Sequence, residues 1–249
     1  MDRVTSKRIL LADLTPEEVK DLEQDLYRLF DRIFGNVSFE TFQHYVTHSG
    51  AEKTTIMLYK NTADETVGFF AFHVFHKVIR GKKMIIFRGQ LGLLEAYRRK
   101  KANMYFGLFQ VLRYRLMYPF RPLYCILTII SPSMYAVLAK NLLRIIPRYN
   151  RTASTQQMAL IKEIGEEWDF EESEEEHPWA TPVGWISVSS EKEREYWRTT
   201  KNLHVRYYQK LNPNFASGVG LITLVPFSWA NIFLSSFKVL YYIIKKKIK

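Results

Sequence analysis

Cysteine is nearly absent from this chain of 249 residues, in which Cys125 is the single example. One cysteine excludes an internal disulfide and is compatible with a reducing compartment. Because Cys125 lies in the apolar run LYCILTII, we expect a core thiol that stays protonated rather than a nucleophile. The N-terminal stretch MDRVTSKRILL is charged and shows no secretory signal. We therefore expect a cytoplasmic protein.

The chain also lacks internal repeats and any nucleic-acid-binding motif. Its formal charge is +11 but unevenly spread, because residues 160–176 hold nine acidic residues and one lysine, which leaves about +19 on the rest. Such a surface suits an anionic partner, which could be nucleic acid, anionic lipid, a phosphorylated cofactor or an acidic carrier protein. Nucleic acid is the weaker choice, since the basic residues stand in separate clusters.

Hydrophobic residues make up 47% of the sequence, enough for a substantial core. Apolar or alternating runs predict strands at 8–14, 54–60, 65–79, 84–94 and 122–130. Helical spacing of apolar residues predicts helices at 16–34, 39–47, 102–117 and 132–143. The first of these helices begins with a capping box, since Thr15 is followed by Pro16 and, three residues on, by Glu18.

The short polar connections favour antiparallel neighbours. The element order therefore predicts an α/β fold with a mixed, mostly antiparallel sheet flanked by helices. Beyond Arg148 the patterns are weaker. Residues 163–178 predict a solvated acidic loop, residues 181–189 a returning strand, and Glu191–Tyr208 one helix. We divide the chain into a domain at 1–190 and a C-terminal helical, apolar and basic extension at 191–249.

Residues 219–237 of this extension contain no charged side chain. Transmembrane length is just met, but Pro226, Asn231 and several serines favour an interfacial helix that is capped by Ser228 and runs from Trp229 to Ile244. The lysines at the end would face anionic lipid. We therefore expect residues 219–249 to bind an anionic membrane surface, peripherally and at its inner face. The alternatives are a helix packed in the core and a dimer contact.

The segment LGLLEAYRRKKANMYFG, residues 91–107, carries the chemistry. An apolar strand ends near Leu94, a basic loop follows, and a helix begins. Such a turn points backbone N–H groups outward at the positive end of a helix dipole, which makes it a receptor for pyrophosphate. The alternative is that RRKK is only a solvated basic face.

This segment resembles the phosphate-binding loop of the GCN5-related N-acetyltransferase (GNAT) superfamily, an apolar strand followed by Tyr-Arg-Gly-Lys-Gly-Ile-Gly and a helix. Tyr97 and Arg98 match it directly, and Lys100 matches its basic residue. The three glycines of the family fall on Arg99, Lys101 and Asn103, and Ala102 takes the apolar position; the lost glycines are a departure, because glycine lets backbone approach phosphate closely. The resemblance is best over residues 8–150.

The resemblance implies a GNAT-like fold that binds acyl-CoA, with no metal. The implied cofactor-binding residues are Leu93, Leu94, Arg98, Arg99, Lys100, Lys101, Ala102, Asn103 and Ser131. A backbone N–H near Leu94 would polarise the thioester carbonyl. The donor could also be an acyl carrier protein.

A general base must take the proton of the attacking amine. Glu95, at the strand end, and His73, on the preceding strand, are the candidates; His76 lies three residues on and faces the opposite side. The family often has a tyrosine in the helix after Ser131 that protonates the leaving thiolate. That position is Leu138 here, and Tyr135, one turn earlier, could replace it. Each of these side chains could instead be an ordinary core or surface residue.

Two functions follow. The first is an enzyme that moves an acyl group from acyl-CoA, or from an acyl carrier protein, to an amine whose identity the sequence does not reveal. The apolar tail would suit a long acyl chain at a membrane surface. The second is a non-catalytic GNAT-like binding module that sits on a membrane or a protein partner.

Overall fold

The computed structural model describes residues 4–35, 37–98, 102–168, 170 and 178–237, without the side chains of 102–105. Contacts divide the chain into two compact units. Unit 1 comprises residues 1–77, 85–119 and 184–189, and unit 2 comprises residues 78–84, 120–183 and 190–249. This division by contacts differs from the boundary predicted at residue 190, which stays a prediction.

Unit 1 is built on an antiparallel sheet whose strands follow the order β1-β3-β4-β5. These strands are β1 (Thr5–Leu10), β3 (Lys53–Lys60), β4 (Thr66–Ile79) and β5 (Lys82–Leu93). The predicted strands are confirmed, except that the first ends at Leu10 and residues 11–13 form the 3-10 helix η1 (Leu11–Asp13). Two further short strands of this unit, β2 (Phe34–Gly35) and β8 (Ile186–Ser187), pair with each other.

Three helices belong to unit 1, namely α1 (Pro16–Ile33), α2 (Phe39–Val46) and α3 (Ala102–Met117). The predicted capping box at Thr15 is present, with Thr15 N donating to Glu18 Oε2 at 2.8 Å and Glu18 N donating to Thr15 Oγ1 at 3.3 Å. It satisfies two N–H groups that the first turn of α1 would leave open.

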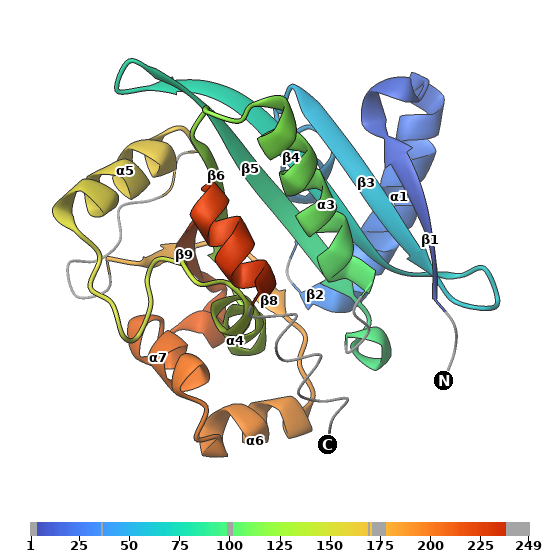
Figure 1. Cartoon of the computed structure of the whole chain (residues 1–249). Helices are drawn as coiled ribbons and strands as arrows, with labels where there is room; N and C mark the ends of the chain where they lie inside the picture. Colours follow the sequence, from blue (N-terminus) through green and yellow to red (C-terminus); the bar gives the residue numbers. More distant parts are fainter. Residues whose placement is uncertain (1–3, 36, 99–101, 169, 171–177, 238–249) are drawn as a thin grey trace. The chain divides into compact units, whose positions relative to one another are not determined.

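Helices α1 and α3 cover opposite faces of the sheet in unit 1 (Figure 1). The alternation of side chains along β4 explains this arrangement. Phe69 packs against Phe30 of α1 with ring centroids 6.0 Å apart, whereas its neighbour Phe70 packs against Phe106 of α3 at 5.4 Å. The aromatic run GFFAF thus supplies the core on both sides of one strand.

Unit 2 has its own antiparallel strands, in the order β6-β9-β7: β6 (Leu123–Ile129), β9 (Val219–Pro226) and β7 (Ala180–Pro182). The stretch 181–189 was expected to be one strand but is divided between β7 and β8, with Gly184 at a positive φ of 80° between them. Cys125, expected in the core, is only partly buried on β6.

Strand β9 corrects the prediction for the uncharged stretch 219–237. Its residues 219–226, predicted as part of a segment that binds a membrane surface, are a mostly buried strand paired along β6, from Tyr124↔Pro226 to Ile129↔Leu221. The β-branched residues of VGLITLV favour this pleated, buried environment. The helix begins at Trp229, as predicted, and Ser228 Oγ caps it by accepting from Asn231 N at 3.2 Å. Across the described ranges, no helix combines the length and the hydropathy needed to cross a bilayer.

The remaining helices of unit 2 are α4 (Pro132–Asn141), α5 (Thr155–Glu166), α6 (Glu191–Thr199) and α7 (Leu203–Leu211), followed by η3 (Phe215–Ser217). The single helix expected over Glu191–Tyr208 is therefore two helices. Asn202 starts α7 by accepting from His204 N at 3.0 Å, a local bond that competes with a continuous helix. The acidic loop expected over 163–178 begins inside α5, and residues 171–177 lie outside the described residues.

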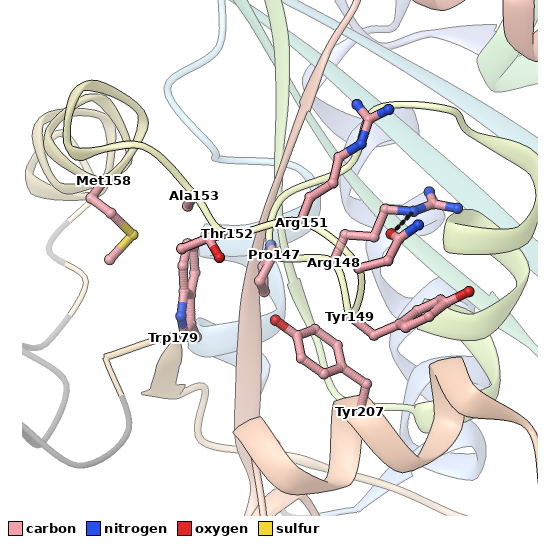
Figure 2. Close-up of a pocket in the computed structure, with 10 residues that line it drawn as sticks. Pro147, Arg148, Tyr149, Arg151, Thr152, Ala153, Met158, Trp179 and Tyr207 are labelled. Carbon is pink, nitrogen blue, oxygen red and sulfur yellow. Dashed lines mark hydrogen bonds between the residues drawn. The ribbon is translucent and has the colours of Figure 1, made fainter.

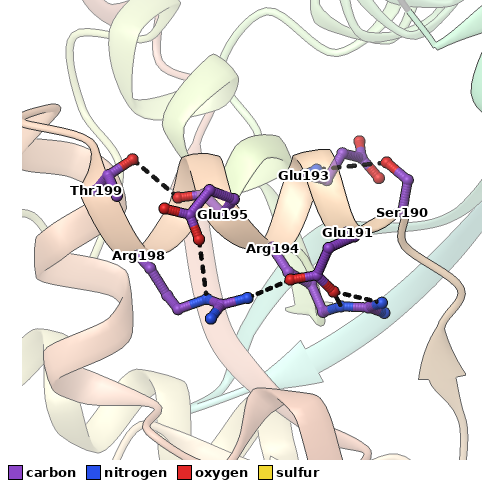
Figure 3. Close-up of polar contacts among 7 residues, drawn as sticks. All are labelled: Ser190, Glu191, Glu193, Arg194, Glu195, Arg198 and Thr199. Carbon is purple, nitrogen blue, oxygen red and sulfur yellow. Dashed lines mark hydrogen bonds and ion pairs between the residues drawn. The ribbon is translucent and has the colours of Figure 1, made fainter.

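Helix α6 carries a chain of ion pairs along its exposed side (Figure 3). Glu191 binds both Arg194, at 2.9 Å, and Arg198, and Arg198 also pairs with Glu195 at 3.6 Å. These side chains are more than half exposed, so each pair contributes about 0.5 kcal/mol at most. The network marks a solvent-facing surface rather than a binding site.

Candidate functional site

The end of β5 fixes the direction of the backbone groups in the predicted acyl-donor site. Leu94 N donates to Val67 O of β4 at 3.0 Å. Because N–H and C=O groups alternate between the two edges of an antiparallel strand, the polar groups of Leu93 point away from β4. The carbonyl of Leu93 agrees with this, since it accepts from Arg98 Nε at 3.2 Å. The N–H of Leu94 is therefore used within the sheet, and the backbone N–H that would meet a thioester stays a prediction.

Gly68 of β4 makes room for this strand end. A Cβ at Gly68 would lie 2.3 Å from the Leu93 side chain and 2.8 Å from Gly92 O, both far inside contact distance. Leu93 can therefore pack over Gly68 against Tyr59 and Val67, and it is 9% exposed. The sequence analysis did not identify Gly68, although a glycine inside a strand indicates close backbone approach.

Arg98 holds the start of the loop. Its Nε binds Leu93 O, and one terminal nitrogen donates to Val188 O at 2.8 Å. The side chain predicted to contact pyrophosphate thus ties the end of β5 to residue 188, just after β8. Val188 was not predicted, and nothing in its local sequence indicates this carbonyl contact. Arg99, Lys100 and Lys101 lie outside the described residues.

The change from strand to helix is confirmed. After Leu94 the chain forms one 3-10 turn, η2 (Glu95–Tyr97), and α3 begins at Ala102. Ala102 and Asn103 therefore occupy the first turn of α3, whose open N–H groups form the positive end of a 16-residue helix. Glu95 is exposed at the first position of η2, directly after the strand end.

His73 lies in the core of unit 1 and is 1% exposed. Its Nδ1 is 3.0 Å from both Ser49 Oγ and Thr54 Oγ1. Burial, and to a lesser degree the positive charge of Arg88, lowers the pKa of His73 to about 4. His76 is exposed, as the spacing of the two histidines predicted. A buried imidazole with so low a pKa is a weak base, and its ring is held by two hydroxyl groups.

Ser131 and Tyr135 belong to unit 2. Ser131 Oγ caps α4 by accepting from Met134 N at 3.4 Å, as its predicted start required. Tyr135 is fully buried, and its hydroxyl donates to Pro147 O at 2.9 Å. Burial raises the pKa of this phenol, which makes it a poorer acid. The structure therefore brings Leu93, Leu94, Glu95 and Arg98 together at one strand end, whereas His73, Ser131 and Tyr135 have local structural partners.

We predict that His73 makes the protein acid-sensitive. The unfolded chain protonates His73 near pH 6.5, but the folded chain does so only near pH 4, so the unfolded state binds more protons between these values. The contribution of neutral His73 to the free energy of unfolding should be fully present above pH 6.5. The free energy of unfolding should then fall by about 3 kcal/mol as the pH approaches 4. Urea titrations at several pH values would measure this slope.

His73→Gln should flatten the slope, whereas His44→Gln, which removes an exposed histidine of α2, should leave it unchanged. An equal slope in wild type and His73→Gln would contradict the assignment.

No family model matches the sequence, and no curated protein matches it. Solved structures do match. A probable N-acyltransferase from Enterococcus faecalis aligns over 56% of this chain and 32% of its own at 13% identity, with a TM-score of 0.38. The GNAT family N-acetyltransferase YhbS of Escherichia coli, in complex with CoA, aligns over 55% of this chain and 68% of its own at 14% identity, with a TM-score of 0.37.

Glucosamine-6-phosphate N-acetyltransferase from Arabidopsis thaliana aligns over 61% of this chain and 96% of its own at 13% identity, with a TM-score of 0.36. This chain spans about a third of the length of the Enterococcus protein. Of these three solved proteins, one is a probable N-acyltransferase and two are N-acetyltransferases, and each aligns with a TM-score below 0.5.

Proposed function

We propose that this chain is a divergent GNAT acyltransferase that moves an acyl group from acyl-CoA to an amine. The observation that carries the proposal is the end of β5. There the hydrogen bond from Leu94 to Val67 turns the N–H of Leu93 away from β4, and a basic segment leads into the N-terminus of α3. A thioester carbonyl and a pyrophosphate are the two groups that these features suit.

The donor would bind in two places along this segment. Its pyrophosphate would lie at the first turn of α3, where the helix dipole and the charges of Arg99, Lys100 and Lys101 favour an anion. Arg98 would act as a positioning residue, because its contacts with Leu93 O and Val188 O fix the strand end. An acyl carrier protein, whose prosthetic arm also ends in a thioester, is the alternative donor.

The reaction would follow from this placement. The amine nitrogen attacks the carbonyl carbon of the thioester, and the oxyanion that forms accepts a hydrogen bond from the N–H of Leu93. The C–S bond then breaks, the thiolate leaves, and the nitrogen gives its proton to the carboxylate of Glu95. We favour Glu95 as base because it is exposed at the strand end, whereas His73 is buried. Tyr135, which was predicted as the acid, is buried and donates a hydrogen bond to Pro147 O.

A non-catalytic binding module is the second candidate. The observation that favours it is the replacement of the family's glycines by Arg99, Lys101 and Asn103, since a side chain at each position hinders close approach of backbone to phosphate. Such a module would still use the basic segment to hold an anionic partner.

Thermal unfolding with acetyl-CoA and with palmitoyl-CoA tests donor binding and compares short with long chains. A donor at about 100 times its dissociation constant should stabilise the protein by about 2.7 kcal/mol. We expect a rise in Tm with at least one thioester and a smaller rise when Arg99, Lys100 and Lys101 are replaced by Gln. The control is one variant that removes the same amount of charge elsewhere, by combining Lys53→Gln, Lys77→Gln and Lys83→Gln. No shift with either thioester would reject the donor site.

Glu95→Gln tests the base. We expect turnover of the bound thioester with a panel of amines (peptide α-amines, lysine side chains, polyamines and amino sugars) to fall about 100-fold, with acyl-CoA affinity unchanged. Glu40→Gln removes an exposed carboxylate of α2 and should have no effect. Full activity of Glu95→Gln would remove Glu95 from the mechanism. Donor binding without turnover of any amine would favour the binding module.

We also propose that unit 2 binds an anionic membrane surface peripherally through the helix that begins at Trp229. The inward face of this helix carries the polar residues Asn231 and Ser235 beside the apolar Ile232. Asn231, 1% exposed, donates to Arg144 O at 3.0 Å and accepts from Arg144 N at 2.8 Å, and Ser235 accepts from Leu143 N at 3.0 Å. Its outward face is apolar, with Phe233, Leu234 and Phe237 exposed by 55%, 49% and 66%.

An ordinary surface helix buries most of its apolar side chains, whereas this helix buries Ile232 and leaves Phe233, Leu234 and Phe237 exposed. The apolar face suits insertion into the headgroup region, and the sequence then supplies Lys238, Lys245, Lys246, Lys247 and Lys249. Each lysine near an anionic surface contributes about 1 kcal/mol, so the basic end would add to the apolar insertion.

Sedimentation with vesicles tests this proposal. We expect binding to vesicles that contain phosphatidylserine and weaker binding to phosphatidylcholine alone, with a loss at high salt. Phe233→Ser with Phe237→Ser should weaken binding about 100-fold, because two apolar side chains no longer leave water. Tyr196→Ser with Leu203→Ser changes two exposed residues of α6 and α7 and should have little effect. Unchanged sedimentation of the phenylalanine variant would reject the anchor.

A further inference from the structure

A cavity of about 400 Å³ lies within unit 2. The loop of residues 147–153 forms much of its wall, and Met158, Trp179 and Tyr207 complete it (Figure 2). Two of the loop residues are arginines, Arg148 and Arg151. Among the described residues that line the cavity, none is acidic.

Arg148 carries a charge that is buried without a carboxylate. It is 8% exposed, and its guanidinium donates to Leu142 O at 2.8 Å, to Leu143 O at 3.4 Å and to Asn150 Oδ1 at 3.0 Å. All these acceptors are neutral. They fix the guanidinium in place but do not balance its charge, and an unbalanced buried charge is unfavourable.

Arg151 adds a second charge beside it. Its backbone N donates to Arg148 O at 3.1 Å, which closes the turn that carries both residues. The side chain of Arg151 is exposed and extends away from the turn (Figure 2). Within the described part of the chain, neither arginine forms an ion pair.

The part of unit 2 that leads into the cavity is basic in sequence. Residues 120–162 include six lysines and arginines and no aspartate or glutamate, before the acidic residues Glu163, Glu166 and Glu167 follow. Rings and hydroxyl groups supply the rest of the wall. Trp179 is 9% exposed, Tyr207 is half-buried with a pKa that burial raises, and Thr152 contributes a hydroxyl. The Tyr207 hydroxyl therefore stays a neutral donor.

We infer that this cavity is a binding site for a phosphate ester with a planar ring, such as a mononucleotide. The arginines would pair with the phosphate, since guanidinium groups bind phosphate oxygens in a fork of two hydrogen bonds. The rings of Trp179 and Tyr207 would pack against the planar ring, and the hydroxyl groups would bind its polar atoms. The site does not depend on the acyltransferase proposal, because none of the residues that line it is assigned to the acyl donor.

Titration of the full chain with AMP, adenosine and inorganic phosphate tests the inference by calorimetry and by tryptophan fluorescence. We expect saturable binding of AMP, weaker binding of phosphate and the weakest binding of adenosine. Trp179→Phe should abolish the fluorescence change. No saturable AMP binding, or equal affinity for adenosine and AMP, would overturn the phosphate-ester site.

Arg151→Gln is the decisive variant, because its side chain is exposed and its loss should not unfold the protein. We expect its AMP affinity to fall tenfold or more, as for the loss of one charge-assisted pair. The control is Arg206→Gln, which removes an exposed charge of α7 that does not line the cavity. Equal affinity of Arg151→Gln and wild type, or an equal loss in Arg206→Gln, would overturn the inference. Circular dichroism would confirm that each variant is folded.

Discussion

The hydrogen bond from Leu94 N to Val67 O is the interaction on which the proposed site depends. It sets the register of the end of β5 against β4, and the alternation of strand geometry then turns the polar groups of Leu93 to the other edge. Gly68 permits this register, since a side chain there would collide with Leu93. Arg98 completes the arrangement by binding the carbonyl of Leu93, so the N–H of Leu93 remains the group that can meet a thioester.

The base proposed for unit 1, Glu95, thus lies outside the buried core. His73 belongs to the buried aromatic and hydroxyl environment of β4, where a charged imidazole is unfavourable. Glu95, by contrast, follows the strand end in an exposed 3-10 turn. The two candidate bases lie in the same unit, and solvent access distinguishes them. A proton acceptor for an incoming amine has to reach the surface.

Unit 2 shows two departures from the usual distribution of polar and apolar groups. The helix that begins at Trp229 turns Asn231 and Ser235 inward and leaves Phe233, Leu234 and Phe237 exposed. The loop at 147–153 buries Arg148 among neutral acceptors. Each arrangement costs free energy in the isolated chain, by exposing apolar area or by leaving a charge unbalanced. A membrane surface would relieve the first cost, and a bound anion would relieve the second.

The sequence by itself determined the elements whose signals are local. The capping box at Thr15, the helix from Ala102 to Met117, the cap at Ser131 and most strand boundaries depend on neighbouring residues, and the structure agrees with them. The strand-to-helix change after Leu94 and its basic segment were predicted for the same reason. Patterns that mix signals were less informative, as at 219–237, where a buried strand and a helix follow each other without a charge.

Only the tertiary structure decided which groups face each other. The N–H of Leu94 is used in a bond to Val67, 27 residues away, and the contact of Arg98 with Val188 O joins positions 90 residues apart. The burial of His73 and Tyr135 and the exposure of Phe233 and Phe237 likewise depend on packing against distant elements. Residue type and spacing state what a side chain can do, but accessibility and hydrogen-bond partners are properties of the folded chain, because long-range contacts create them.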